Sequence, residues 1–334
     1  MDMSNVVERE ESYMFFYRLN DCRLELNENG KITEIVFPEK VYGVPTLNNS
    51  RRCVAVASVN KIFVYDFESE TIITLFHKSK LHITDVRFDK KDNLYYIDGN
   101  NIGVIDIITS NDTILYNVGK KQHNPQNIGI SPNGRYVSFC GYRGDNLCLY
   151  LYDMQKEEFK DYKLSIYHYA WLDDDHLVWS KGGGLKVLDV NTGKSQLIVK
   201  DHKSLIKKSG KENIEMFDAF EGIDSTSLFI DLDLLRVLNG NIYFSLAINY
   251  FGNGVPEDAK QHYGIWSINL EENTIKFHYE FPDEYRNANA GYKFLMNNGS
   301  LAWAKNDWHI FDGITETTLL GDWEQVICFD SLNA

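Results

Sequence analysis

Short apolar runs separated by polar turns dominate the chain, and helical periodicity is nearly absent. Within residues 126–164 four such runs, at 126–130, 135–140, 146–152 and 158–164, alternate with turn-forming residues. Runs of this length, rich in β-branched and aromatic side chains and bounded by Gly, Pro, Asn or Asp, are typical of β-strands. The pattern therefore predicts four strands joined by tight turns in this segment.

Units of the same kind recur along most of the chain. They are predicted at 41–76, 82–118, 166–199 and 292–320, and a further set of strands runs through 228–250 and 264–281. Four-stranded units that repeat about every 40 residues are the sequence signature of a β-propeller, in which each unit forms one blade. Because blades pack face to face, their middle strands are buried on both sides, which accounts for continuous apolar runs such as LCLYLY.

The two ends of the chain are predicted to share a blade. Residues 13–37 contain three strands and lack a fourth, and the isolated strand at 325–331 has no hairpin partner of its own. Joining these segments would close the ring and remove two exposed sheet edges. The fold class expected is therefore all-β, a single seven-bladed β-propeller over residues 1–334, with six or eight blades as the alternatives.

The segment 126–164 also resembles a known repeat family. Its first turn, at 131–135, reads Ser-Pro-Asn-Gly-Arg and is followed by an apolar strand, a Gly/Arg turn, Leu-Tyr and Asp153. This order resembles the TolB-type, WD-like propeller repeat, with Asn133 and Arg135 in place of an Asp and a Lys. The resemblance implies an architecture and no particular activity, because propellers carry many unrelated functions.

Net charge narrows the choice of partners. The chain has 34 basic and 48 acidic residues, a formal charge of −14. Such an excess repels phosphate backbones, so nucleic-acid binding is not expected, whereas a basic protein, a cation or a neutral ligand is favoured. The N-terminal residues lack the apolar segment of a signal peptide, and no run of 18 apolar residues occurs. A cytoplasmic monomer without membrane contact is expected.

Sequence motifs for catalysis, metals and disulfides are weak. No Gly-x-Ser-x-Gly is present, Gly252 and Gly254 lack the third Gly of a dinucleotide site, and Asp173–Asp175 lacks the spacing of a calcium loop. The five cysteines are scattered without a metal-ligand spacing. We expect buried free thiols, with a Cys140–Cys148 disulfide as the alternative, and no cofactor.

Two segments interrupt the repeat, at 200–227 and 250–263. In repeat folds such insertions map to loops on one face, which is often the binding face. The first combines acidic with large apolar residues, and the second places aromatic residues around glycines. The expected partner-binding residues are Glu212, Glu215, Met216, Phe217, Asp218, Phe220, Glu221, Asp224, Tyr250, Phe251, His262 and Tyr263. The alternative is that their apolar side chains only attach the insertions to the ring.

One pair of acidic residues suggests a second type of site. Asp231 and Asp233 alternate along a predicted strand. If that strand were innermost, both side chains would point to one side of the ring axis and could hold a cation or a hydroxyl group. The function predicted first is a non-catalytic cytoplasmic propeller that binds a protein partner, expected to be basic, through its insertion-bearing face. The alternative is an enzyme, or a binder of a small molecule or cation, that uses the mouth of the central channel, as in lactonase-like or glycosidase-like propellers.

Overall fold

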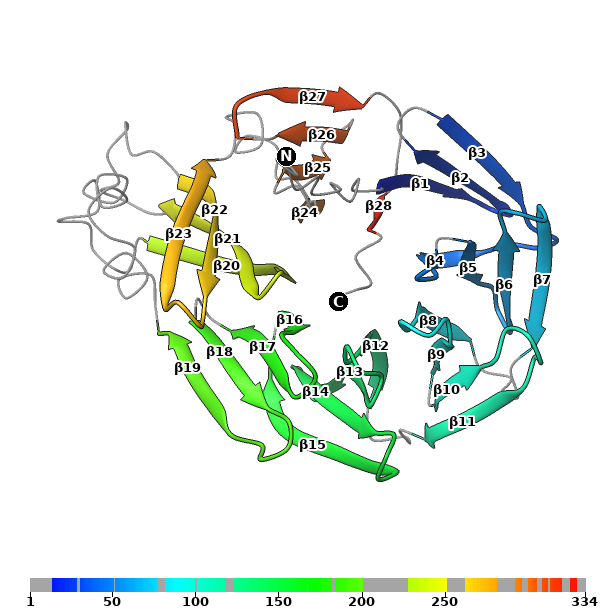
Figure 1. The fold of residues 1–334 in the computed structure, drawn as a ribbon, viewed down its shortest axis with the longest axis horizontal. Helices are drawn as coiled ribbons and strands as arrows, with labels where there is room; N and C mark the ends of the chain where they lie inside the picture. The colour runs from blue at the N-terminus through cyan, green and yellow to red at the C-terminus, as the bar shows by residue number, and fades with distance from the viewer. Residues whose placement is uncertain are drawn as a thin grey trace, which may run out of the picture.

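Seven four-stranded antiparallel sheets form the described part of the molecule and are arranged in a ring (Figure 1). The computed structural model describes residues 14–28, 31–50, 52–76, 82–99, 101–117, 123–166, 168–181, 184–200, 228–250, 262–280, 292–295, 300–304, 308–311, 313–319 and 325–328. Described residues include no helix. The predicted all-β class and the repeated four-stranded units are thereby confirmed.

In each sheet the strands follow one another outward from the middle of the ring (Figure 1). The first three sheets in chain order are β28 (Gln325–Cys328), β1 (Met14–Asn20), β2 (Arg23–Glu28) and β3 (Lys31–Val36); β4 (Tyr42–Leu47), β5 (Cys53–Ala57), β6 (Lys61–Asp66) and β7 (Thr71–Phe76); and β8 (Ile83–Phe88), β9 (Leu94–Asp98), β10 (Asn101–Ile105) and β11 (Asp112–Asn117). The next two are β12 (His123–Ile130), β13 (Tyr136–Arg143), β14 (Asn146–Asp153) and β15 (Glu158–Ser165); and β16 (His168–Trp171), β17 (His176–Lys181), β18 (Gly184–Asp189) and β19 (Ser195–Val199). The last two are β20 (Leu228–Leu238), β21 (Asn241–Tyr250), β22 (His262–Asn269) and β23 (Thr274–Glu280); and β24 (Tyr292–Leu295), β25 (Leu301–Ala304), β26 (Trp308–Phe311) and β27 (Glu316–Leu319).

The hydrophobic core lies between neighbouring sheets rather than at one centre. On β14, Tyr150 packs against the sheet β8–β11, whereas Leu149 and Leu151 pack against the sheet β16–β19. All three side chains are fully buried. Side chains of a strand alternate between its faces, so a strand buried on both faces needs an unbroken apolar run. The outer strand β15 is only half-buried along most of its length, as its polar sequence predicts.

A recurring turn follows the third strand of five sheets. The last or next residue of that strand is an Asp or Asn whose side chain accepts backbone N–H groups of the turn; in Asp153 the Oδ1 atom lies 3.1 Å from the nitrogen of Gln155 and 3.2 Å from that of Lys156. The capping residues are Asp66, Asp106, Asp153, Asp189 and Asn269. Four positions after each, the backbone is left-handed, at Glu70, Ser110, Glu157, Gly193 and Asn273. Each turn therefore satisfies its own amides from within its hairpin.

The sheet at the chain ends combines both termini. Strand β28 pairs antiparallel with β1, with Phe16 opposite Val326 and Tyr17 opposite Gln325. The sheet order is β28-β1-β2-β3, so the C-terminal strand is innermost and the N-terminal strands lie outside it.

Cys140 and Cys148 lie on opposite faces of their sheet. Cys140 packs in the core shared with β16–β19, and Cys148 packs in the core shared with β8–β11. Both are free, as are Cys22 and Cys53 among the described residues. The alternative of a Cys140–Cys148 disulfide is therefore wrong, because neighbouring strands would have to turn one side chain through the sheet. Burial raises the pKa of Cys140 to about 12, which keeps the thiol protonated and unreactive.

Candidate functional site

Both insertions adjoin the same end of the sheet β20–β23. Leu228, the first residue of β20, is paired with Tyr250, the last of β21, and Ile248 is paired with His262, the first of β22. The first insertion therefore leads into the start of β20. The second insertion leaves from the end of β21 and returns at the start of β22, at the same end of the sheet. This placement is what the repeat pattern predicts for insertions that share a face.

Most of the residues predicted to bind a partner fall outside the described part of the chain. Those outside it are Glu212, Glu215, Met216, Phe217, Asp218, Phe220, Glu221, Asp224 and Phe251. Tyr250, His262 and Tyr263 lie at the strand ends just described, where the structure describes the backbone and not the side chains. Their assignment to an interface stays a prediction.

Asp231 and Asp233 lie on an innermost strand. Strand β20 begins its sheet and packs beside β16 and β24 of the flanking sheets. The backbone of Asp231 is paired with Ala247 and that of Asp233 with Ser245. The site at Asp231 and Asp233 was predicted on the condition that their strand is innermost, and the strand order of this sheet meets that condition.

A different set of polar residues occupies the inner wall on β8, β12 and β16. Strand β12 contains an extra residue between Gln126 and Gly129, which are paired with Cys140 and Ser138, so the strand is bulged there. Asn127, within this bulge, has a φ of 56° and an exposed side chain. Left-handed backbone is uncommon outside Gly, and bulges often re-aim a side chain beside a functional site. We refer to Asp85, Arg87, Asn127, Ile128 and Tyr169 as the inner-wall cluster.

The preceding sheet holds the bulge through Ile128. Oδ2 of Asp85 accepts the N–H of Ile128 at 2.8 Å, and a guanidinium nitrogen of Arg87 lies 3.4 Å from the carbonyl oxygen of the same residue. Both side chains come from β8 and are half-buried. They bond the peptide groups of Ile128 much as a neighbouring strand would, although β8 and β12 belong to different sheets.

The following sheet holds the bulge through Asn127. The hydroxyl of Tyr169 on β16 donates to the carbonyl oxygen of Asn127 at 2.5 Å, and Nε1 of Trp171 donates to Oγ of Ser138 at 3.1 Å. Gly129 permits this approach, because a Cβ atom there would lie 2.7 Å from Oγ of Ser138 and 3.1 Å from the Tyr169 hydroxyl. Three side chains from two flanking sheets thus fix the backbone of Asn127 and Ile128.

The cluster carries one acid and one base. Burial raises the pKa of Asp85, opposed by the N–H of Ile128 and the charge of Arg87. Burial also raises the pKa of Tyr169 well above its ordinary value, so its hydroxyl stays protonated at neutral pH and acts as a donor. The described inner wall around Asn127 therefore carries one acidic and one basic side chain, and Thr84, the residue before Asp85 on β8, is exposed.

Metal-binding geometry is not found. Within the described ranges no group of three or more His, Cys, Asp or Glu side chains could hold a metal ion. One Ser–His pair is present, since Nε2 of His278 lies 2.8 Å from Oγ of Ser267. Burial lowers the pKa of His278, yet Ser267 is only 6% exposed, so this pair is best explained as a satisfied interior contact.

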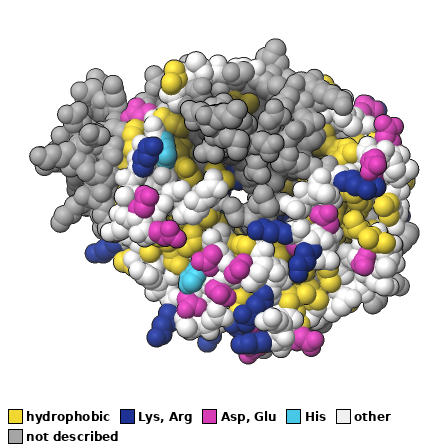
Figure 2. Space-filling model, viewed as in Figure 1, with side chains coloured by type: hydrophobic (Ala, Val, Ile, Leu, Met, Phe, Trp, Pro, Cys, Tyr) yellow, Lys and Arg dark blue, Asp and Glu magenta, His cyan; other side chains and the backbone are white. Residues whose placement is uncertain are grey.

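In the view of Figure 2, Asp and Glu side chains are mixed with Lys and Arg side chains over the lower part of the ring. Asp173 accepts the N–H groups of Asp175 and His176, each at 2.8 Å, and so caps its own turn. The Arg135 guanidinium donates to both carboxylate oxygens of Asp153. Asp173 and Asp153 therefore both have structural partners within the fold.

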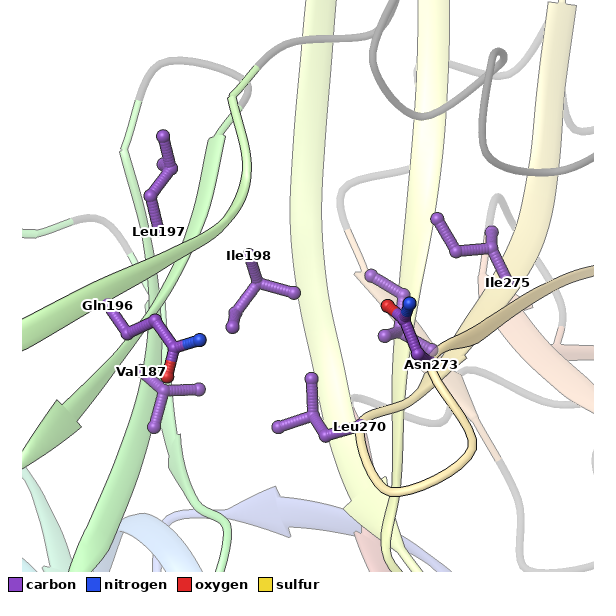
Figure 3. A pocket seen from close by; sticks show the side chains of 8 residues that line it. Val187, Gln196, Leu197, Ile198, Leu270, Asn273 and Ile275 are labelled. Carbon is purple, nitrogen blue, oxygen red and sulfur yellow. The ribbon is translucent and has the colours of Figure 1, made fainter.

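A cavity of about 220 Å³ opens between the sheets β16–β19 and β20–β23 (Figure 3). Gln196 and Ile198 line one side, and Leu270, Asn273 and Ile275 line the other. Pockets for cofactors or drug-sized ligands usually measure about 300–1,000 Å³. This cavity is smaller and continues the apolar core between the two sheets, and we assign it no function.

Comparisons with known proteins agree on the fold alone. No protein-family model matches the chain. No curated protein matches it in sequence either. An oligogalacturonate lyase from Vibrio parahaemolyticus matches with a TM-score of 0.59 at 8% identity, over 92% of this chain and 86% of that one.

Two further structures have the same architecture. A chain of a mitotic checkpoint complex matches with a TM-score of 0.55 at 14% identity, over 89% of this chain and 84% of that one. Streptogramin B lyase matches with a TM-score of 0.54 at 13% identity, over 89% and 88%. These likenesses confirm the resemblance to propellers expected from residues 126–164. At such identities they carry no activity to this chain.

The inner-wall cluster was not found from the sequence, although a signal exists. Asp85 and Ile128 are 43 residues apart, and Asn127 and Tyr169 are 42 apart. Both separations are close to one repeat, so the residues occupy similar positions in successive units. Superimposing the units would have grouped these polar residues on the innermost strands.

The described residues contain no helix that could cross a membrane.

Proposed function

We propose that this protein is a non-catalytic, cytoplasmic binding protein that engages a protein partner through the edge bearing both insertions. The observation that carries the proposal is the register of sheet β20–β23, which places Leu228, Tyr250 and His262 at the same end of the sheet. Long loops held by a rigid sheet are a common place for recognition residues. The acidic excess of the chain favours a basic partner, whose approach it would accelerate.

Two paired variants test this proposal. Phe217→Ala with Phe220→Ala should weaken binding mainly by faster dissociation, because large apolar side chains supply the buried centre of an interface. Glu215→Lys with Glu221→Lys should slow association and flatten its salt dependence. Both pairs should keep the parent melting temperature. Partners from a native cytosolic extract would be identified by pull-down and then measured by surface plasmon resonance.

The proposal also has a structural part, the closure of a seven-bladed ring by the sheet that both termini share. It is supported by the pairing of β1 with β28 and by the position of that sheet between β24–β27 and β4–β7 in Figure 1. Such a closure removes two free sheet edges, which would otherwise pair with other chains. The protein would then act as a monomer.

A second candidate function is the binding of a small molecule at the inner wall. The specific observation in its favour is the left-handed, exposed Asn127, held by side chains of two neighbouring sheets. The position of Asp231 and Asp233 on an innermost strand also supports the binding of a small molecule at the inner wall. Mutation separates the two functions, since changes at 212–224 would affect only the partner and Asp231→Asn only the small molecule.

A further inference from the structure

We infer that the side-chain amide of Asn127 is the contact group of a binding site for a small neutral carbohydrate on the inner wall. The inference deepens the second candidate function and is independent of the partner proposed for the insertions. It rests on the backbone of Asn127, the exposure of its side chain, and the chemistry of the groups around it.

The backbone at Asn127 is fixed more strongly than the fold requires. Both ends of the peptide group that joins Asn127 to Ile128 are held, its carbonyl oxygen by the Tyr169 hydroxyl at 2.5 Å and its N–H by Asp85 at 2.8 Å. A residue in a sparsely populated conformation persists only where its surroundings determine it, and such residues concentrate at ligand-binding sites. The point from which the Asn127 side chain projects is thereby set before any ligand arrives.

The backbone conformation alone would favour glycine at position 127. Glycine adopts a positive φ without steric cost, and the six glycines with positive φ in the described residues do so in turns or at strand starts. Asn is the side chain that tolerates the conformation best, yet it still costs more than glycine. The amide of Asn127 is exposed and has no hydrogen-bond partner among the described residues. Nine non-glycine residues of the described ranges have a positive φ, and Asn127 is the one on an innermost strand, where its amide faces the inner wall rather than a turn.

The neighbouring groups identify the class of ligand. The amide offers a donor and an acceptor side by side, which suits two adjacent hydroxyl groups. Thr84 on β8 is exposed as well, and its Oγ1 lies 3.3 Å from the carbonyl oxygens of Ile97 and of Pro125, two residues before Asn127. Asp85 and Arg87 add one carboxyl and one guanidinium, so a charged ligand gains no net attraction. Mixed donors and acceptors without net charge match the vicinal hydroxyls of a neutral sugar.

The decisive variant is Asn127→Gly, which removes the amide and keeps the left-handed backbone. Its matched control is Lys163→Gly: Lys163 is also left-handed, with a φ of 54°, and also lies within a strand, on β15 at the outside of the ring. Both glycine variants should melt at the parent temperature or above it, because each relieves the same backbone conformation.

Saturation-transfer NMR on the full-length protein supplies the readout. The probes are glucose, galactose, mannose and sucrose, with glucuronate and glucosamine as charged counterparts. We expect at least one neutral sugar to bind saturably, the charged ones to bind no better, Asn127→Gly to weaken binding about tenfold or more, and Lys163→Gly to leave it unchanged.

Several results would overturn the inference. They are the absence of binding by every neutral sugar, preference for a charged sugar, binding that survives in Asn127→Gly, or a lower melting temperature of that variant, which would make Asn127 structural. None of these results bears on capture of a protein partner, which is measured separately with the variants at Phe217 and Phe220.

Discussion

The hydroxyl of Tyr169 lies 2.5 Å from the carbonyl oxygen of Asn127, and this hydrogen bond joins two sheets at their innermost strands. Tyr169→Phe should lower the free energy of unfolding by about 1 kcal/mol, the usual value for one hydrogen bond. Tyr162→Phe is a matched control, because the Tyr162 hydroxyl donates to the carbonyl oxygen of Val190, also at 2.5 Å. Denaturant unfolding should find similar losses in both. Only Tyr169→Phe should shift the NMR signals of the Asn127 amide, and equal shifts in both variants would contradict the coupling.

Gly129→Ala should be more damaging than either hydroxyl deletion. The added methyl group would meet Oγ of Ser138 at 2.7 Å, where the side chain is fully buried and bonded to Trp171. Overpacking of a filled core costs about 1–3 kcal/mol. Gly144→Ala is the comparison without steric contact, since a Cβ atom at Gly144 meets nothing within 4 Å; its φ of +58° disfavours Ala, so it should lose some stability, but less than Gly129→Ala. Thermal unfolding of both variants checks the prediction; an unchanged melting temperature for Gly129→Ala would mean that the inner wall yields to the methyl group.

Asp85 should make the protein less tolerant of rising pH than a variant without it. Burial raises the pKa of Asp85 above its ordinary 3.8, so the folded state binds its proton more tightly than the unfolded state. The corresponding stability is complete below pH 3.8 and is lost as the pH rises through the folded pKa.

The variant Asp85→Asn keeps an oxygen acceptor for Ile128 and does not titrate. Its stability relative to the parent should therefore increase between pH 4 and pH 7. Urea unfolding of both proteins at each pH measures the difference. A difference that stays constant or declines would show that the carboxylate is stabilised by Arg87 more than it is destabilised by burial.

Arg135 should contribute far more to the free energy of unfolding than Arg143, although both form ion pairs. Asp153 is fully buried, whereas the Arg143–Asp161 pair is partly exposed on both sides. Burial raises the pKa of Asp153, but Arg135 and two turn amides outweigh it, so the pKa lies below its ordinary value.

Removing the Arg135 guanidinium in Arg135→Met would leave a buried carboxylate without its cation, at about 3 kcal/mol. Arg143→Met should cost about 1 kcal/mol or less. The stability that Asp153 supplies is present above pH 3.8 and is lost as the pH falls through its lowered pKa, so Arg135→Met should also flatten the acid limb of the stability curve. Equal losses in the two variants at pH 7 would contradict this account.

The strands could be predicted from the sequence because burial on two faces produces unbroken apolar runs, as on β14. The polar residues of the inner wall could not. Strand β12 carries an extra residue at its bulge, and a bulge moves every later side chain to the other face without changing the composition of the run. The bonds from Asp85 and Tyr169 reach across 43 and 42 residues, so local pattern holds no trace of them. Gly129 was the one local sign, since a glycine inside a strand often marks the close approach of another chain segment.

The shared terminal sheet provides the fifth test. Deletion of 324–334 removes β28 and leaves β1 without its partner, and we expect cooperative unfolding to be lost. The strand contributes Val326 and Ile327, each worth about 1.5–3 kcal/mol if buried, against a total stability of about 5–15 kcal/mol for a typical domain. Deletion of 331–334 alone is the control. Circular dichroism melts of the two truncations decide the matter, and a long deletion that melts within a few degrees of the control would argue against closure.

The capped turns have a consequence for the ancestry of the molecule. In Asp66, Asp106, Asp153 and Asp189 the acceptor that satisfies each turn belongs to the same hairpin as the amides it binds. A stretch of gene that encodes one blade therefore carries everything its turn needs. Such a stretch can be duplicated or transplanted without leaving a turn amide unpaired in the copy, and the copies can then diverge elsewhere while the turn stays intact.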